Sequence, residues 1–181
     1  MDWFDDVRLR ARRKNKVLFI PGDSLLDGLS ALVEGTGRLA LALWALDLAA
    51  EAVARLERLL PGEARPAEAL RLSRLWARGQ VKMPAAKAAI LACHAVAKEG
   101  VSPEAAAFCH AVGQACAVVH ARGHALGFAV YELTAIARRE GVEECRAAVE
   151  GRVREYAAQL ARAQAGAQSA SGPWAKFLKQ G

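Results

Sequence analysis

Residues 38–62 read RLALALWALDLAAEAVARLERLLPG, and this stretch decides the fold class. Its large apolar residues recur every three or four positions, the spacing that places side chains on one face of an α-helix. Pro61 and Gly62 then end the pattern, because proline cannot continue a helix and glycine favours the turn that follows one. The sequence therefore predicts a helix over residues 38–60, with an apolar face formed by Leu39, Leu43, Leu46, Ala50 and Val53.

The same combination of apolar periodicity and proline or glycine punctuation predicts four further helices, over residues 66–79, 84–100, 103–139 and 142–165. Gly123 and Gly127 predict a bend or break within the third of them. Alanine, the best helix former and a poor strand former, makes up roughly a fifth of the chain. We therefore expect an all-α fold, a compact bundle of about six or seven antiparallel helices joined by short loops.

The 181 residues suffice for about one domain, and their composition predicts three parts. Residues 1–35 are expected to form an N-terminal extension, with an amphipathic helix over residues 1–16 and an extended apolar segment over residues 17–20 laid on the helical body. Residues 36–165 form the bundle, and residues 166–181 form a linker and a short amphipathic tail. The apolar side of the first helix is expected to consist of Trp3, Phe4, Val7 and Leu9.

The net charge of +6 is compatible with an acidic protein, a nucleic acid or an anionic membrane as partner. A local excess of cations between Arg8 and Lys16 is interpreted as a solvated terminal segment, with phosphate contact as the alternative. No recognition helix stands out, so direct binding of nucleic acid is not favoured. No apolar run is long enough to cross a membrane, so we expect no membrane partner.

Four cysteines, none of them in a CxxC pair, lie in alanine-rich apolar stretches. They are expected to be buried free thiols, and with no signal peptide in view this indicates the reducing cytoplasm. An echo between residues 92–96 (ACHAV) and 108–112 (FCHAV) is interpreted as coincidence in an alanine-rich background.

The candidate metal ligands, expected close to one face of a helix, are Cys109, Cys116, His120 and His124. The sequence HARGH over residues 120–124 lacks the glutamate that follows the first histidine of a zinc protease, so that class is excluded. The simpler interpretation is that the cysteines pack as small apolar residues and that the histidines bond to a backbone carbonyl or a carboxylate. We predict no cofactor and no catalytic group.

The remaining candidates are polar or aromatic residues on the predicted helices. Asp47 and Glu51 lie four apart on the 38–60 helix, where Arg55 or Arg71 could pair with them, in a buried network or on a solvated face. Residues expected in a polar network or a ligand pocket are Asp47, Arg78, His94, His120, His124 and Tyr131, with Asp47 and Arg78 in contact inside the bundle. Trp44 and Trp76 are expected to be core anchors.

Four blocks over residues 40–137 carry a family resemblance. They are LALWALD (41–47), RP (65–66) leading to LWARG (75–79), His94 in its alanine-rich helix, and HARGHALGFAVY (120–131). In this order and spacing they resemble the Imm-five-like family of bacterial immunity proteins of polymorphic toxin systems. The chain departs from the family pattern at Ala115, where a histidine is expected.

The resemblance implies an all-α, cytoplasmic, non-enzymatic protein that binds a cognate toxin and neutralises it by steric masking. A basic protein would then suit an acidic toxin face. Two alternatives stay open: a helical protein that binds a metal or small ligand through the histidine and cysteine face, and a basic nucleic-acid-binding protein. Homo-oligomerisation is also left open.

Overall fold

A computed structural model describes residues 2–180, which contain eight α-helices, two short 3-10 helices and no strand. The all-α prediction is therefore confirmed, while the helix count is one or two higher than predicted. The α-helices are α1 (Trp3–Arg12), α2 (Asp27–Gly35), α3 (Arg38–Leu59), α4 (Arg65–Ala77), α5 (Met83–Val96), α6 (Pro103–Ala117), α7 (His124–Glu140) and α8 (Arg146–Ser169). The 3-10 helices are η1 (Ser24–Leu26) and η2 (Lys176–Leu178).

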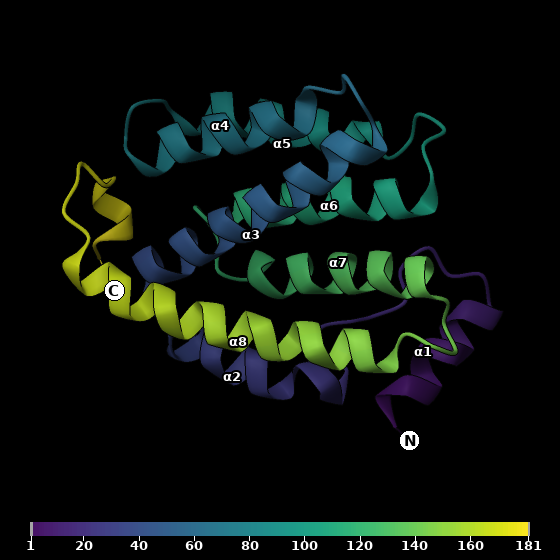
Figure 1. The fold of residues 1–181 in the computed structure, drawn as a ribbon. Helices are drawn as coiled ribbons and strands as arrows, with labels where there is room; N and C mark the ends of the chain where they lie inside the picture. Colours follow the sequence, from purple (N-terminus) through teal and green to yellow (C-terminus); the bar gives the residue numbers. More distant parts are fainter. Residues whose placement is uncertain (1, 181) are drawn as a thin grey trace.

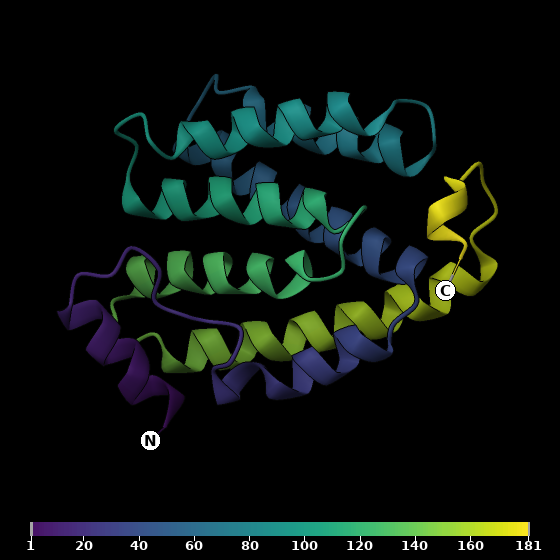
Figure 2. The ribbon, with the colours of Figure 1, turned by 180° about the vertical axis from the view of Figure 1, so that it is seen from behind.

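Helix α3 is the central element of the bundle. It packs against α4, α6 and α8, and it crosses α6 obliquely (Figure 1). Seen from behind, α5, α6, α7 and α8 lie in succession, with α2 beside α8 (Figure 2). Consecutive helices from α4 to α7 are packed neighbours, as the short loops predict.

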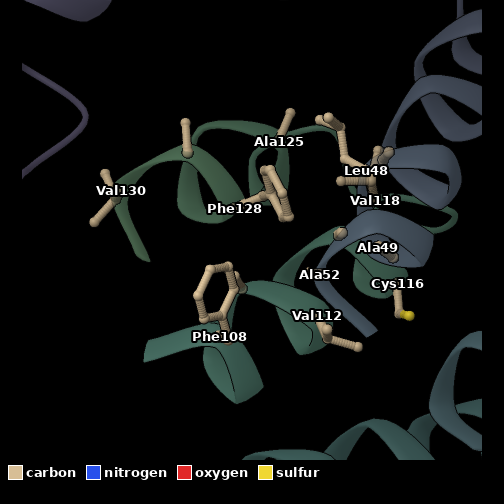
Figure 3. Close-up of a cluster of buried hydrophobic side chains, with 14 of the residues drawn as sticks. Leu48, Ala49, Ala52, Phe108, Val112, Cys116, Val118, Ala125, Phe128 and Val130 are labelled. Atoms are coloured by element: carbon tan, nitrogen blue, oxygen red, sulfur yellow. The ribbon is translucent and has the colours of Figure 1, made fainter. Parts of the chain in front are cut away.

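The core lies where α3 meets the hairpin formed by α6 and α7. Ala49 and Ala52 of α3 are buried and face Phe108 and Phe128 (Figure 3). Methyl side chains on α3 let the helices approach closely, and the two phenyl rings fill the remaining space. The high alanine content therefore allows the helices to pack closely, and it does not leave the protein without a hydrophobic core.

The extra helix is α2, in a stretch for which the sequence predicted no helix. Gly28 and Gly35 lower its intrinsic helix propensity, and no side chain caps its N-terminus. Leu29 and Val33, four residues apart, are buried, and α2 packs against α8. Tertiary packing therefore stabilises a helix that local propensity does not favour.

The predicted break in the segment 103–139 is confirmed. Helix α6 ends at Ala117, residues 118–123 form the turn, and α7 begins at His124. The two helices therefore run antiparallel and pack along each other.

The N-terminal residues join the same core. Trp3, Phe4 and Val7 of α1 are buried, but Leu9 is 39 % exposed and does not belong to the apolar side predicted for it. Residues 17–20 are extended as predicted, and the Leu18 N–H donates to Oγ1 of Thr134 on α7 at 3.0 Å.

The C-terminal tail docks on α4. Helix α8 continues to Ser169, so the first four residues of the predicted linker are helical instead. Beyond it, the Ala175 N–H donates to the Ala77 carbonyl at 2.8 Å, and the Phe177 ring packs against Trp76. No helix within residues 2–180 combines the length and hydropathy that a bilayer crossing requires.

Candidate functional site

All four histidines of the chain lie along the seam between α5, α6 and α7, and together they form what we call the histidine row. His94 comes from α5, His110 from α6, His120 from the turn after α6, and His124 is the first residue of α7. The antiparallel α6–α7 hairpin brings these positions together, although 30 residues separate the first from the last in sequence.

His94 and His110 form a hydrogen-bonded imidazole pair. Their Nδ1 atoms are 2.9 Å apart, so one ring donates its proton to the other. On the far side of His110, the ring of Tyr131 lies 4.9 Å away between centroids. The row therefore runs from α5 across α6 to α7.

Two glycines make room for the row. His94 lies directly against Gly113, where a Cβ would come within 2.4 Å of the imidazole ring. The His124 Nδ1–H donates to Oε1 of Gln114 at 2.8 Å, and the Gln114 amide in turn lies against Gly127. Glycine at both positions is thus required by side chains that cross between helices.

Burial lowers the pKa of three of these histidines. The pKa of His94 falls to about 4, because burial disfavours its cation and because His110 and His124 are close by. Burial, and then Lys98, lowers the pKa of His110; burial, and then His120, lowers the pKa of His124. All three are therefore uncharged at neutral pH.

The first hollow beside the row is mainly apolar, has a volume of about 420 Å³, and is called the α5 groove here. Met83 and Leu91 on its edge are 45 % and 56 % exposed, so two large apolar side chains border the same hollow on its solvent side. The groove is lined by Trp76, Met83, Lys87, Ile90, Leu91, His94, Gln114, Ala117, His120 and His124.

The second hollow, the basic cavity, has a volume of about 360 Å³ and lies on the other side of His110. It is lined by Lys14, Lys16, Val17, Pro103, Ala106, Ala107, His110, Tyr131 and Arg138. The structure therefore brings His94, His120 and His124 together in one groove but places Tyr131 in the other hollow.

His110 was not predicted as a site residue. The echo between residues 92–96 and 108–112 could have indicated it. His94 and His110 hold equivalent places in the echo and bond to each other. Cys93 and Cys109 also hold equivalent places in the echo, and the Cys93 Sγ–H donates to the Cys109 carbonyl at 3.3 Å. The echo marks the two faces that meet between α5 and α6.

The expected histidine and cysteine face does not exist, because the helix that was to carry it ends at Ala117. Cys109 and Cys116 point into the core, and burial raises the pKa of Cys116 to about 12. Within residues 2–180 no group of three or more histidine, cysteine or acidic side chains is arranged to hold a metal ion. All four cysteines are buried and free, as predicted.

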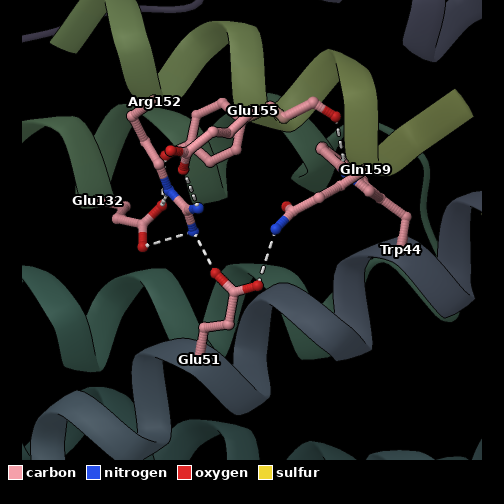
Figure 4. Close-up of polar contacts among 7 residues, drawn as sticks. Trp44, Glu51, Glu132, Arg152, Glu155 and Gln159 are labelled. Atoms are coloured by element: carbon pink, nitrogen blue, oxygen red, sulfur yellow. Dashed lines mark hydrogen bonds and ion pairs between the residues drawn. The ribbon is translucent and has the colours of Figure 1, made fainter. Parts of the chain in front are cut away.

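Of the acidic pair on α3, Glu51 has a different partner from those expected. Glu51 accepts from Arg152 of α8 at 2.7 Å, and Arg152 also binds the buried Glu132 of α7 (Figure 4). Arg55 pairs with Glu104 and Arg71 with Glu68 instead, because α8 and not α4 covers this side of α3.

The expected contact between Asp47 and Arg78 is also absent. Both residues are exposed, and Arg78 lies over the ring of Trp174 at 5.9 Å. Desolvation raises the pKa of Asp47, against the attraction of Arg74. The two tryptophans are buried: Trp44 donates from Nε1 to the Tyr156 carbonyl at 3.1 Å, and Trp76 packs against His120 and Phe177.

A charge pattern in the segment that spans α4 and α5 was not among the sequence predictions. Between Glu68 and Glu99 the chain has no acidic residue but six cations. Of these, only Arg71 has a carboxylate partner within residues 2–180. The six are Arg71, Arg74, Arg78, Lys82, Lys87 and Lys98.

Comparison with known proteins gives one match. A search of curated proteins and a search of solved structures each found none. The family model described as "Imm-5 like putative immunity protein" matches residues 31–159, which is well over half of the chain and includes the whole histidine row. The chain therefore belongs to this Imm-5 like family.

Proposed function

We propose that the protein binds a cognate toxin through the α5 groove and neutralises it by covering the toxin's functional surface. The observation that carries this proposal is the pair of exposed apolar side chains, Met83 and Leu91, on the edge of a groove of about 420 Å³ in a chain of this family. The reading requires no bond to be made or broken, so the protein acts as a binding partner and not as an enzyme.

The composition of the groove suits a protein segment as its occupant. Trp76 and Ile90 are nearly buried, and Met83 and Leu91 stand at the edge. Interfaces between proteins place apolar and aromatic side chains at the centre and polar groups at the rim. His94 and His124 add groups that are polar but uncharged at neutral pH, which lowers the cost of desolvating the groove.

The charge around the groove defines the partner further. Lys87 lines the groove and Lys82 directly precedes Met83 on its edge, and neither lysine has a carboxylate within ion-pair distance in the described part of the chain. A toxin segment with apolar side chains flanked by aspartate or glutamate would complement them. The free thiols of the four buried cysteines fit binding in the reducing cytoplasm, where a delivered toxin would act.

The test measures whether the protein binds the toxin encoded beside this gene, and whether it protects cells that express that toxin. Leu91→Asp places a carboxylate on the exposed edge of the groove, next to where acidic toxin groups would lie. It should weaken binding in calorimetry by about a hundredfold or more, as for a central interface residue, and abolish protection of cells that express the toxin.

Leu32→Asp is the matched control. Leu32 on α2 is 42 % exposed, and helix α2 packs against α8 and lies away from α5 (Figure 1). It should leave both binding and protection unchanged. Equal effects of the two substitutions, or full binding by Leu91→Asp, would remove the α5 groove from the interface. Lack of any binding by the unsubstituted protein to the neighbouring toxin would overturn the function.

A further inference from the structure

We propose that the basic cavity binds a small organic phosphate. This site is separate from the α5 groove and does not depend on the toxin proposal. Three segments form its walls: the loop after α1, the first half of α6 and the second half of α7.

The charge of the cavity indicates a dianion. Lys14, Lys16 and Arg138 line it, no acidic side chain does, and none of the three has a carboxylate within 4.0 Å in residues 2–180. The nearest acid of α6 in sequence, Glu104, accepts from Arg55 at 2.9 Å instead. Several cations without a counter-charge around one hollow are the arrangement that binds phosphate groups.

Arg138 and the backbone of the loop that carries the two lysines are held in place before any ligand binds. Arg138 Nη2 donates to the carbonyls of Asn15 and Lys16 at 3.0 and 2.9 Å, which fixes the loop on α7. The hydrogen bond from Leu18 to Thr134 fixes the next residues of the same segment. Within the described residues Nε and Nη1 of Arg138 have no hydrogen-bond partner, so they are free for a ligand. Preorganisation of this kind reduces the entropy lost on binding.

The backbone of Lys14 carries an independent signal. Helix α1 ends in a Schellman turn, in which the Lys14 N–H donates to the Ala11 carbonyl and the Asn15 N–H donates to the Arg10 carbonyl. Lys14 holds the position of this motif that glycine usually occupies, with φ of 58°. A lysine there costs about 1 kcal/mol against glycine, so its side chain and not its backbone explains its presence.

The rest of the lining suits an organic body of modest size. Val17, Ala106 and Ala107 supply apolar walls, and the half-buried rings of His110 and Tyr131 lie against each other at 36°. His110 Nε2 and the Tyr131 hydroxyl have no hydrogen-bond partner within residues 2–180. A volume of about 360 Å³ lies in the range of small-ligand sites, and it exceeds the needs of inorganic phosphate alone.

The experiment measures binding of phenyl phosphate, inorganic phosphate and benzoate to the full chain by calorimetry. Phenyl phosphate should bind most tightly, because it offers both the dianion and the apolar body. Benzoate binding as tightly as phenyl phosphate would overturn the assignment to phosphates, and so would no heat with any of the three.

Lys14→Gly is a variant in which a loss of phosphate binding could not be attributed to unfolding. It should raise the melting temperature by relieving the positive φ, while weakening phenyl phosphate binding about fivefold through the loss of one cation. Arg13→Gln removes the same charge one residue away, outside the cavity, and should leave the affinity unchanged. Equal affinities in Lys14→Gly and the unsubstituted protein would overturn the proposal. Leu91→Asp should bind phenyl phosphate normally, which separates this outcome from that of the toxin experiment.

Discussion

The imidazole of His94 occupies the space in which residue 113 would carry a side chain. A Cβ built on Gly113 would lie 2.4 Å from both Cε1 and Nε2 of His94. The contact joins α5 to α6 at the centre of the histidine row, and it holds His94 within hydrogen-bond distance of His110.

Gly113→Ala should destabilise the protein, although alanine is the better helix former. Alanine gains about 1 kcal/mol from helix propensity, but overpacking of this severity typically costs about 1–3 kcal/mol. His94 must leave the seam and lose its bond to His110. Denaturant unfolding should show a net loss of about 1 kcal/mol.

A double-mutant cycle with His94→Ala checks the cause. In the His94→Ala background the added methyl group meets no ring, so Gly113→Ala should be neutral or stabilising there. A loss of equal size in both backgrounds would show that the ring is not what excludes a Cβ.

The histidine row predicts how stability depends on pH. The folded chain holds the pKa of His94 near 4, whereas an unfolded histidine titrates near 6.5. Between these values the unfolded state binds more protons, so stability is complete above about pH 6.5 and falls as the pH falls towards 4. His110 and His124 act in the same direction, while the raised pKa of Glu132 acts in the opposite one.

Comparison with His94→Gln isolates the histidine contribution. Glutamine keeps a group that can bond to His110 but does not titrate. The free energy of unfolding of His94→Gln should therefore fall less steeply between pH 6.5 and 4 than that of the unsubstituted protein. Parallel curves for the two proteins would assign the pH dependence to other groups.

The sequence predicted those elements whose ends are marked by local chemistry. The helix expected over residues 38–60 is found at Arg38–Leu59, and Pro61 explains its end. Helix α6 begins where Ser102 precedes Pro103, and the Ser102 hydroxyl accepts from the Ala105 N–H at 3.2 Å. Signals of this kind act within one turn, so a single chain carries them without knowledge of its neighbours.

What the sequence did not predict depends on contacts between distant segments. Helix α2 is stabilised by packing on α8, and the partner of Glu51 is Arg152, 101 residues away. Three histidines of the groove were anticipated as pocket residues, but His110 joined them only through the packing of α6 on α5. Periodicity tells which face of a helix is apolar but not which helix will cover it.

The hydroxyl of Thr134 should be important for the extended segment over residues 17–20. It accepts from the Leu18 N–H at 3.0 Å and donates to the Val130 carbonyl at 2.8 Å, and it is fully buried. Thr134→Val keeps the shape but leaves the Leu18 N–H without a partner, which should cost about 1–3 kcal/mol.

Thr134→Ser is the control for this substitution, because it removes a methyl group and keeps the hydroxyl. Amide hydrogen exchange at Leu18 should accelerate in the valine variant relative to the serine variant. Slow exchange at Leu18 in both would mean that the segment is held by the burial of Leu18 and Phe19 alone.

Arg152 should be the most costly charged residue to remove, because the carboxylate that it neutralises cannot reach water. Glu132 is 5 % exposed and accepts from Nε and Nη2 of Arg152 at 2.9 and 3.1 Å, as well as from the Tyr156 hydroxyl. Arg152→Met leaves this carboxylate buried without its cation, which should cost about 3–5 kcal/mol near neutral pH. Glu132→Gln keeps a hydrogen-bond acceptor and leaves Arg152 with Glu51 and Glu155, so it should cost about 1–2 kcal/mol.

The pH dependence of the Arg152→Met loss distinguishes an unpaired charge from lost packing. Desolvation already raises the pKa of Glu132, and removing Arg152 raises it further. The folded variant then binds a proton that the unfolded chain does not, so its stability deficit should shrink as the pH is lowered from 8 towards 5. Arg55→Met breaks a pair with Glu104 that is more open to water, and it should cost less than about 1 kcal/mol at either pH. A deficit in Arg152→Met that stays constant from pH 8 to 5 would attribute the loss to the missing side-chain contacts over the Tyr156 ring instead.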